Sequence, residues 1–138
     1  MVDQGEASWA SLPAAEREEM DEVVAMLTEA AAQGHMEAQS YLGDIYSFGD
    51  GVAQDYGRAF ELRTQAARQG HAVSQYNLGT MYWEGRGCEP SDERAAELWA
   101  KAAEQGDAFA QCELGRAHQG GEGVSRSYER ALELYKLS

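Results

Sequence analysis

The residues of this sequence that could do chemistry are three histidines, two cysteines and a recurring pair of glycines. His35 and His71 each follow a Gln-Gly step, and the two steps lie 36 residues apart, so a place in a repeated turn explains them better than metal binding. His118 stands where the two earlier copies of the same repeat have tyrosine, which favours a packing role over that of a base. We therefore predict no catalytic residue and no enzyme activity.

The cysteines and glycines also lack the spacing of a cofactor or metal site. Cys88 and Cys112 form neither a CxxC pair nor a cysteine–histidine pattern of the zinc-binding kind. They are predicted to be free thiols in a reducing compartment, and a disulfide between them is the alternative. The Gly-x-Gly steps follow predicted helices and lack the Gly-Lys-Ser/Thr of a phosphate loop. Asp50, inside one such step, lacks the further carboxylates of a calcium loop. We therefore expect no cofactor and no metal.

The balance of charges narrows the classes of partner. The 138 residues carry 24 acidic and 11 basic side chains, a formal net charge of −13 at pH 7. Nucleic acids and anionic membranes attract clustered lysine and arginine, so neither is expected as a partner. Residues 1–30 hold eight carboxylates against Arg17, which fits either a solvated helix face or the recruitment of a basic partner.

The chain carries no recognisable targeting segment. No stretch reaches the roughly 20 apolar residues of a membrane span. The N-terminus is acidic and has no apolar run, unlike a secretory signal or a transit peptide. The sequence therefore predicts a cytoplasmic protein.

A threefold internal repeat organises the sequence. Residues 31–66, 67–102 and 103–138 align without a gap, and 12 of the 36 columns are identical in all three copies. The identical columns include the Gln-Gly, Leu-Gly, Gly-x-Gly and Arg-Ala steps. With a tail at 1–13 and a helix at 14–33, the three copies are predicted to form one domain.

Each copy predicts two helices joined by the Gly-x-Gly step. The first helix of copy one spans about residues 36–48, with apolar side chains at helical spacing. The glycines supply the positive φ that ends this helix and turns the chain. The second helix faces inward through alanine and leucine and ends at Gln69-Gly70. Its predicted N-caps in the three copies are Asp55, Ser91 and Ser127.

A glycine lies in the middle of the first helix of every copy, at Gly43, Gly79 and Gly115. Each costs about 1 kcal/mol relative to alanine in a helix. Because this loss of helix stability recurs at the same position in every copy, we expect the glycine to make the same compensating interaction in each. That interaction is predicted to be close approach of the second helix, which carries alanine in the facing column.

Residues 14–33 continue the phase of the repeat toward the N-terminus. Ser11 is the predicted N-cap, and Pro13 is tolerated in the first turn. The helix caps the first copy or forms half of a preceding one. Its apolar stripe consists of Met20, Val23, Val24, Leu27 and Ala31.

The pattern A-x-x-x-L-G-x-x-Y-x-x-G-x-G-V, then D-x-x-x-A-x-x-L and A-A-x-x-G, resembles the Sel1-like repeat, a relative of the tetratricopeptide repeat. It is clearest over residues 38–52 and 74–88, and the resemblance covers 31–138 fully and 14–30 in part. It implies an all-α fold, a right-handed α-solenoid of antiparallel helix pairs. It also implies a non-catalytic adaptor or scaffold for protein–protein interaction.

The related tetratricopeptide fold lines a concave groove with the first helix of each pair. Tyr76 and Trp83 share a helix face and suit anchoring of a partner, although a core role for either is equally open. The groove lacks the lysine and asparagine clamp for acidic tails, so we expect a peptide with apolar anchors and basic residues near Asp44. Carried over by phase, the predicted partner-binding residues are Ser40, Asp44, Ser47, Tyr76, Thr80, Trp83, Cys112, Arg116 and Gln119.

The C-terminal end predicts a second mode of association. The chain stops before the usual A-A-x-x-G ending, so the last helix lacks the helix that would cover it. Either the natural protein continues or this end pairs with another chain. The alternative function is therefore a structural or oligomerisation segment of a larger protein. The predicted uncovered residues are Leu132, Leu134, Tyr135 and Leu137.

Overall fold

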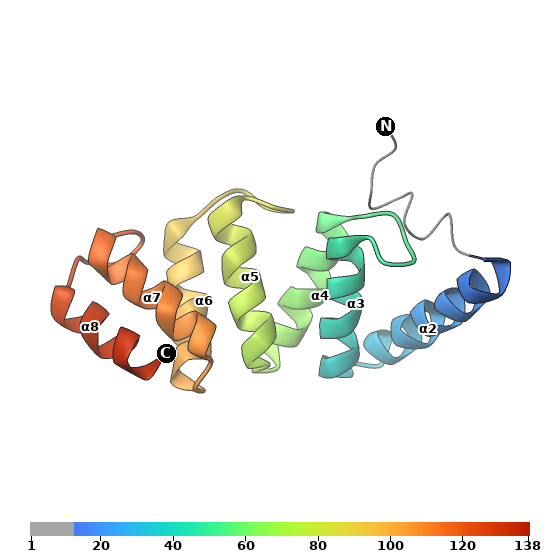
Figure 1. The fold of residues 1–138 in the computed structure, drawn as a ribbon, viewed down its shortest axis with the longest axis horizontal. Helices are drawn as coiled ribbons and strands as arrows, with labels where there is room; N and C mark the ends of the chain where they lie inside the picture. Colours follow the sequence, from blue (N-terminus) through green and yellow to red (C-terminus); the bar gives the residue numbers. More distant parts are fainter. Residues whose placement is uncertain (1–12) are drawn as a thin grey trace.

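The computed structural model describes residues 13–138 as a row of helices that follow one another along a single axis (Figure 1). Each helix packs on the ones before and after it in the chain, and the described residues contain no strand. The predicted all-α solenoid of helix pairs is confirmed. The helices are α2 (Ala14–Ala32), α3 (Met36–Phe48), α4 (Tyr56–Arg68), α5 (Ala72–Glu84), α6 (Asp92–Glu104), α7 (Ala108–Gly120) and α8 (Tyr128–Leu137).

The helix ends follow the predicted local signals. Gly49 ends α3 with φ 75°, and the equivalent glycines end α5 and α7 in the same left-handed conformation. Asp55 caps α4 by accepting a hydrogen bond from the Arg58 N–H at 3.0 Å, and Ser91 and Ser127 cap α6 and α8 in the same way. Ser11, the predicted cap of α2, lies outside the described residues.

His71 has the structural role that its position in the turn predicts. It is the N-cap of α5, where its Nδ1 accepts a hydrogen bond from the Ser74 N–H at 3.2 Å. Asp107 does the same for α7 through the Ala110 N–H at 2.8 Å. The same position of the repeat is therefore the helix N-cap in both copies, with histidine in one and aspartate in the other.

The mid-helix glycines allow the close approach that was predicted, but the contacting group differs. A Cβ on Gly79 would lie 2.8 Å from Trp99 Cδ1 and 3.1 Å from the Ala95 carbonyl oxygen. Tyr135 covers Gly115 in the same way, at 2.9 Å. The large side chain four residues after the alanine therefore fills the space above each glycine, together with the alanine backbone.

A ladder of glutamines links successive copies through their interior. Gln75 is buried, donates a hydrogen bond to the Ala67 carbonyl at 3.2 Å and accepts one from Gln105 Nε2 at 2.8 Å. Gln39 makes the same two bonds with Ala31 and Gln69. Two of the identical columns of the repeat thus pair with one another across adjacent copies.

The hydrophobic core is small and rich in alanine, with Trp99 as its largest side chain. Leu134 packs into this core and is only 2% exposed, so the prediction that it lies uncovered is wrong. Leu132, Tyr135 and Leu137 are exposed as predicted. No helix within residues 13–138 is both long and apolar enough to span a bilayer.

Candidate functional site

The predicted partner-binding residues of the second and third copies come together on the surface of α5 and α7. The ring of Tyr76 lies 5.8 Å from the ring of Phe109, centroid to centroid. The Arg116 guanidinium stacks over the Trp83 ring at 4.6 Å. We call Tyr76, Trp83, Phe109 and Arg116 the aromatic cluster. Sequence reasoning missed Phe109, because its column holds glutamate and valine in the other two copies.

Trp83 is the exposed member of a pair of tryptophans, and the other member, Trp99, is buried. Its ring centroid lies 6.4 Å from that of Trp99, and Arg116 also lies 5.8 Å from the Trp99 ring. Trp83 is 44% exposed whereas Trp99 is 2% exposed. Trp83 therefore combines the two roles that the sequence left open, because part of its ring packs on Trp99 and the rest faces solvent.

Two carboxylates fix the arginine of the aromatic cluster. Arg116 Nε lies 3.0 Å from Glu113 Oε2, and its Nη1 lies 2.6 Å from Glu122 Oε2. Burial alone would lower the pKa of Arg116, but the hydrogen bonds with Glu122 and Glu113 raise it overall. The guanidinium therefore presents a flat, charge-compensated face beside Trp83.

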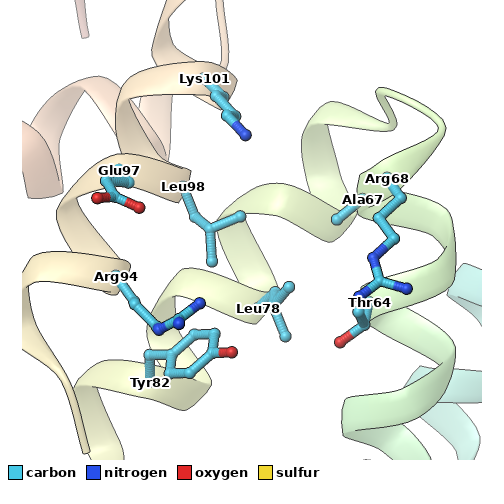
Figure 2. Close-up of a pocket in the computed structure, with 9 residues that line it drawn as sticks. All are labelled: Thr64, Ala67, Arg68, Leu78, Tyr82, Arg94, Glu97, Leu98 and Lys101. Atoms are coloured by element: carbon cyan, nitrogen blue, oxygen red, sulfur yellow. The ribbon is translucent and has the colours of Figure 1, made fainter.

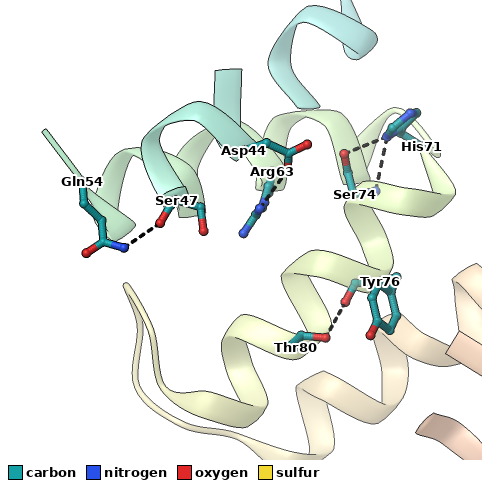
Figure 3. Close-up of polar contacts among 8 residues, drawn as sticks. All are labelled: Asp44, Ser47, Gln54, Arg63, His71, Ser74, Tyr76 and Thr80. Atoms are coloured by element: carbon teal, nitrogen blue, oxygen red, sulfur yellow. Dashed lines mark hydrogen bonds and ion pairs between the residues drawn. The ribbon is translucent and has the colours of Figure 1, made fainter. Parts of the chain in front are cut away.

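The surroundings of Tyr76 raise the pKa of its hydroxyl. The residue is half-buried, and burial raises this pKa. A side-chain hydrogen bond with Thr80 lowers this pKa, the carboxylates of Glu113 and Asp107 raise it, and the net direction is upward. Thr80 lies one turn away and donates its hydroxyl to the Tyr76 carbonyl at 3.2 Å (Figure 3).

The residues predicted in the first copy are less available to a partner. Ser40 is 6% exposed, so the prediction that it lines an open groove is wrong. Asp44 Oδ1 accepts a hydrogen bond at 2.9 Å from Arg63 Nη2, so a cation of the chain already neutralises it (Figure 3). Ser47 is half-buried, and its carbonyl accepts a hydrogen bond from Gln54.

The remaining predicted residues lie at the edge of the cluster. Gln119 is exposed and accepts a hydrogen bond from the Tyr135 hydroxyl at 2.8 Å. Cys112 is an exposed free thiol, and Cys88 is a half-buried free thiol, so the two form no disulfide. Burial and the neighbouring Glu89 raise the pKa of Cys88. Within residues 13–138, no three or more His, Cys, Asp or Glu side chains gather as a metal ion would require.

The model of the Sel1 repeat family matches residues 37–71, 72–107 and 108–138. The chain belongs to the Sel1 repeat family. Each matched unit holds one helix pair: α3 with α4, α5 with α6, and α7 with α8. Sel1 repeats are generally protein-interaction modules and are typically non-catalytic scaffolds.

Solved structures support this assignment. The c5321 protective antigen of uropathogenic Escherichia coli, which has an SLR fold, is 39% identical with a TM-score of 0.79 over 80% of this chain and 24% of its own. A Sel1 repeat protein of Oxalobacter formigenes is 30% identical with a TM-score of 0.77 over 91% of this chain and 54% of its own. This Sel1 repeat chain thus spans about a quarter and about half of these two proteins.

The Sel1 fold extends to more distant proteins. Cysteine rich protein B of Helicobacter pylori is 17% identical, with a TM-score of 0.68 over 88% of this chain and 86% of its own, and shares the fold. A comparison with curated proteins finds no match.

Proposed function

We propose that this Sel1 repeat chain is a non-catalytic adaptor that binds a peptide or protein segment across α5 and α7. The observation that carries the proposal is the half-exposed Trp83 ring, which packs against both the buried Trp99 and the fixed Arg116. A large aromatic side chain that is already ordered loses little entropy when a partner covers it. Phe109 adds a second aromatic surface, which is 71% exposed, beside Tyr76.

The chemistry of the aromatic cluster indicates which partner it suits. Arg116 is compensated by Glu113 and Glu122, so the cluster carries no excess positive charge for an acidic ligand. The chain as a whole is strongly acidic. A peptide with aromatic or aliphatic anchors, flanked by basic residues, therefore suits the exposed aromatic rings of this surface and the negative charge of the chain.

Replacing Trp83 with alanine tests the proposal. The binding partner would first be captured on the immobilised domain and identified. Calorimetry would then measure its affinity for the wild type and for the variant. We expect Trp83→Ala to weaken binding about 30-fold, the cost of a central aromatic anchor. Tyr41→Ala is the matched control, because Tyr41 is an exposed aromatic on α3 outside the cluster and should leave affinity unchanged. Unchanged binding by a well-folded Trp83→Ala protein would refute the proposed site.

A second candidate function is self-association through the C-terminal end. Leu137 is 65% exposed and Leu132 is 56% exposed on α8. Leu137 also borders a hollow of about 360 Å³ beside Leu114 and Leu134. If this end pairs with a second copy, light scattering should give a mass that rises with concentration, and Leu137→Glu should restore the monomer. A constant monomer mass at high concentration would exclude this function.

A further inference from the structure

A notch between consecutive repeats recurs along the solenoid, apart from the aromatic cluster. One such notch lies between α4, α5 and α6, where Leu78, Tyr82 and Leu98 form its apolar wall (Figure 2). All nine of its lining positions, counted 36 residues earlier, line a second notch between α2, α3 and α4. The hollow at the C-terminal end, beside Leu114 and Leu134, is the third.

Charge distinguishes the notch at α4, α5 and α6 from the other two. Three cations, Arg68, Arg94 and Lys101, line it against the single carboxylate of Glu97. Each of the other notches holds one arginine and one glutamate. We call the site at α4, α5 and α6 the basic notch. Its local charge is positive, whereas the net charge of the whole chain is −13.

Among the residues that the structure describes, the cations of the basic notch have no carboxylate partner. Arg68, Arg94 and Lys101 form no ion pair with any residue from 13 to 138. The arginines that correspond to Arg94 are paired, Arg58 with the Asp55 N-cap and Arg130 with Glu133 at 3.0 Å.

Arg94 lacks the aspartate that pairs with Arg58, and it lies over a tyrosine ring. Its helix begins with a serine cap, Ser91, where α4 begins with aspartate. The guanidinium instead lies 5.7 Å from the centre of the Tyr82 ring, which holds it against the wall of the notch. Figure 2 shows Leu78 and Leu98 between Arg94 on one side and Arg68 on the other.

We infer that the basic notch binds a glutamate or aspartate side chain of an acidic peptide, with an adjacent apolar side chain against Leu78 and Leu98. The volume of about 220 Å³ fits one or two side chains. Unpaired arginines and a lysine supply charge-assisted hydrogen bonds to a carboxylate. A short acidic segment can stay within the notch, whereas a long polyanion such as nucleic acid would also meet the acidic remainder of the chain and is disfavoured.

The basic notch and the aromatic cluster are separate sites. Tyr82 and Trp83 are consecutive on α5 and therefore point about 100° apart around the helix axis. Leu98 and Trp99 are also consecutive, on α6, so Leu98 points toward the notch and Trp99 points toward Trp83. The chain can thus hold an acidic segment at the notch and a second segment at the cluster, so the Trp83→Ala variant should bind the acidic peptide normally.

A labelled peptide tests the inference. The probe is fluorescein–Gly-Glu-Leu-Glu-Leu-Glu-Gly, and its control has glutamine in place of each glutamate. Fluorescence anisotropy should show binding of the acidic probe that weakens with added salt. We expect the double variant Arg94→Gln, Lys101→Gln to lose about tenfold or more in affinity. The charge-matched control is the double variant Arg126→Gln, Lys136→Gln. It removes two exposed cations that form no ion pair within residues 13–138, and it should bind as the wild type does.

Several results would overturn the inference. One is equal affinity of the Arg94/Lys101 double variant and the wild type, with both shown to be folded by circular dichroism. Another is equal binding of the glutamine peptide, which would leave only an apolar site. Complete competition by millimolar inorganic phosphate would indicate a site for a free anion, and a rise in the mass of the protein instead of peptide binding would indicate a second copy as the occupant.

Discussion

Replacing Gly79 with leucine is expected to lower the free energy of unfolding by about 3 kcal/mol, the upper range for overpacking a core. A Cβ at this position would already lie 2.8 Å from the Trp99 ring and 3.1 Å from the Ala95 carbonyl. The Trp99 ring is 2% exposed and packs within the hydrophobic core, so it cannot move aside into solvent without breaking core contacts. For a domain of this size the change corresponds to a drop of about 12 °C in the melting temperature, measured by circular dichroism.

Two controls separate crowding from other effects at Gly79. Glu97→Leu on α6 adds the same side chain at an exposed helical position, where a change of about 0.5 kcal/mol or less is expected. Gly43→Ala should cost less than Gly79→Ala, because the Cβ at Gly43 would meet the flexible Arg63 side chain at 3.2 Å. Equal melting temperatures for Gly79→Leu and Glu97→Leu would contradict the packing explanation.

Local sequence signals predicted the helices and their ends. The glycine that ends α3 and the caps of α4, α6 and α8 depend on residues within one turn, so their effect is readable from short patterns. The groups that fill the space above the mid-helix glycines were not predicted. They are Arg63, Trp99 and Tyr135, which differ in each copy and lie 20 residues after their glycine. Comparison of the three copies therefore could not show that the side chain at this position covers the glycine.

The candidate sites, like the fold, were predicted only in part from the sequence. The repeat phase predicted that Tyr76, Trp83 and Arg116 share one surface, because each lies on the first helix of its copy. The contacts themselves join columns three positions apart, Tyr76 with Phe109 and Trp83 with Arg116. Phase could not show that Ser40 is buried, since that depends on side chains of neighbouring helices. The basic notch was missed because its three cations come from two helices, and because Arg68 and Lys101 stand in columns that are not basic in the other two copies.

Replacing Gln75 with methionine is expected to lower the free energy of unfolding by about 2 kcal/mol. Methionine matches the length of glutamine but cannot donate to the Ala67 carbonyl or accept from Gln105. Both groups would then lose a hydrogen bond at a buried junction between copies, where unsatisfied polar groups cost about 1–3 kcal/mol. Urea unfolding followed by circular dichroism measures the change, and Gln65→Met, at an exposed position of α4, is the control.

The end of the glutamine ladder offers a comparison within the same column. Gln111 is buried and donates to the Ala103 carbonyl at 3.3 Å, as Gln75 does to Ala67, but its side-chain oxygen accepts no hydrogen bond within residues 13–138. Gln111→Met removes one bond where Gln75→Met removes two, so it should cost about 1 kcal/mol less. Equal costs would mean that the bond between Gln75 and Gln105 adds nothing to the coupling of adjacent repeats. A larger cost at Gln75 would show that the two identical glutamine columns stabilise the solenoid as a pair, since neither side chain can make this bond within its own copy.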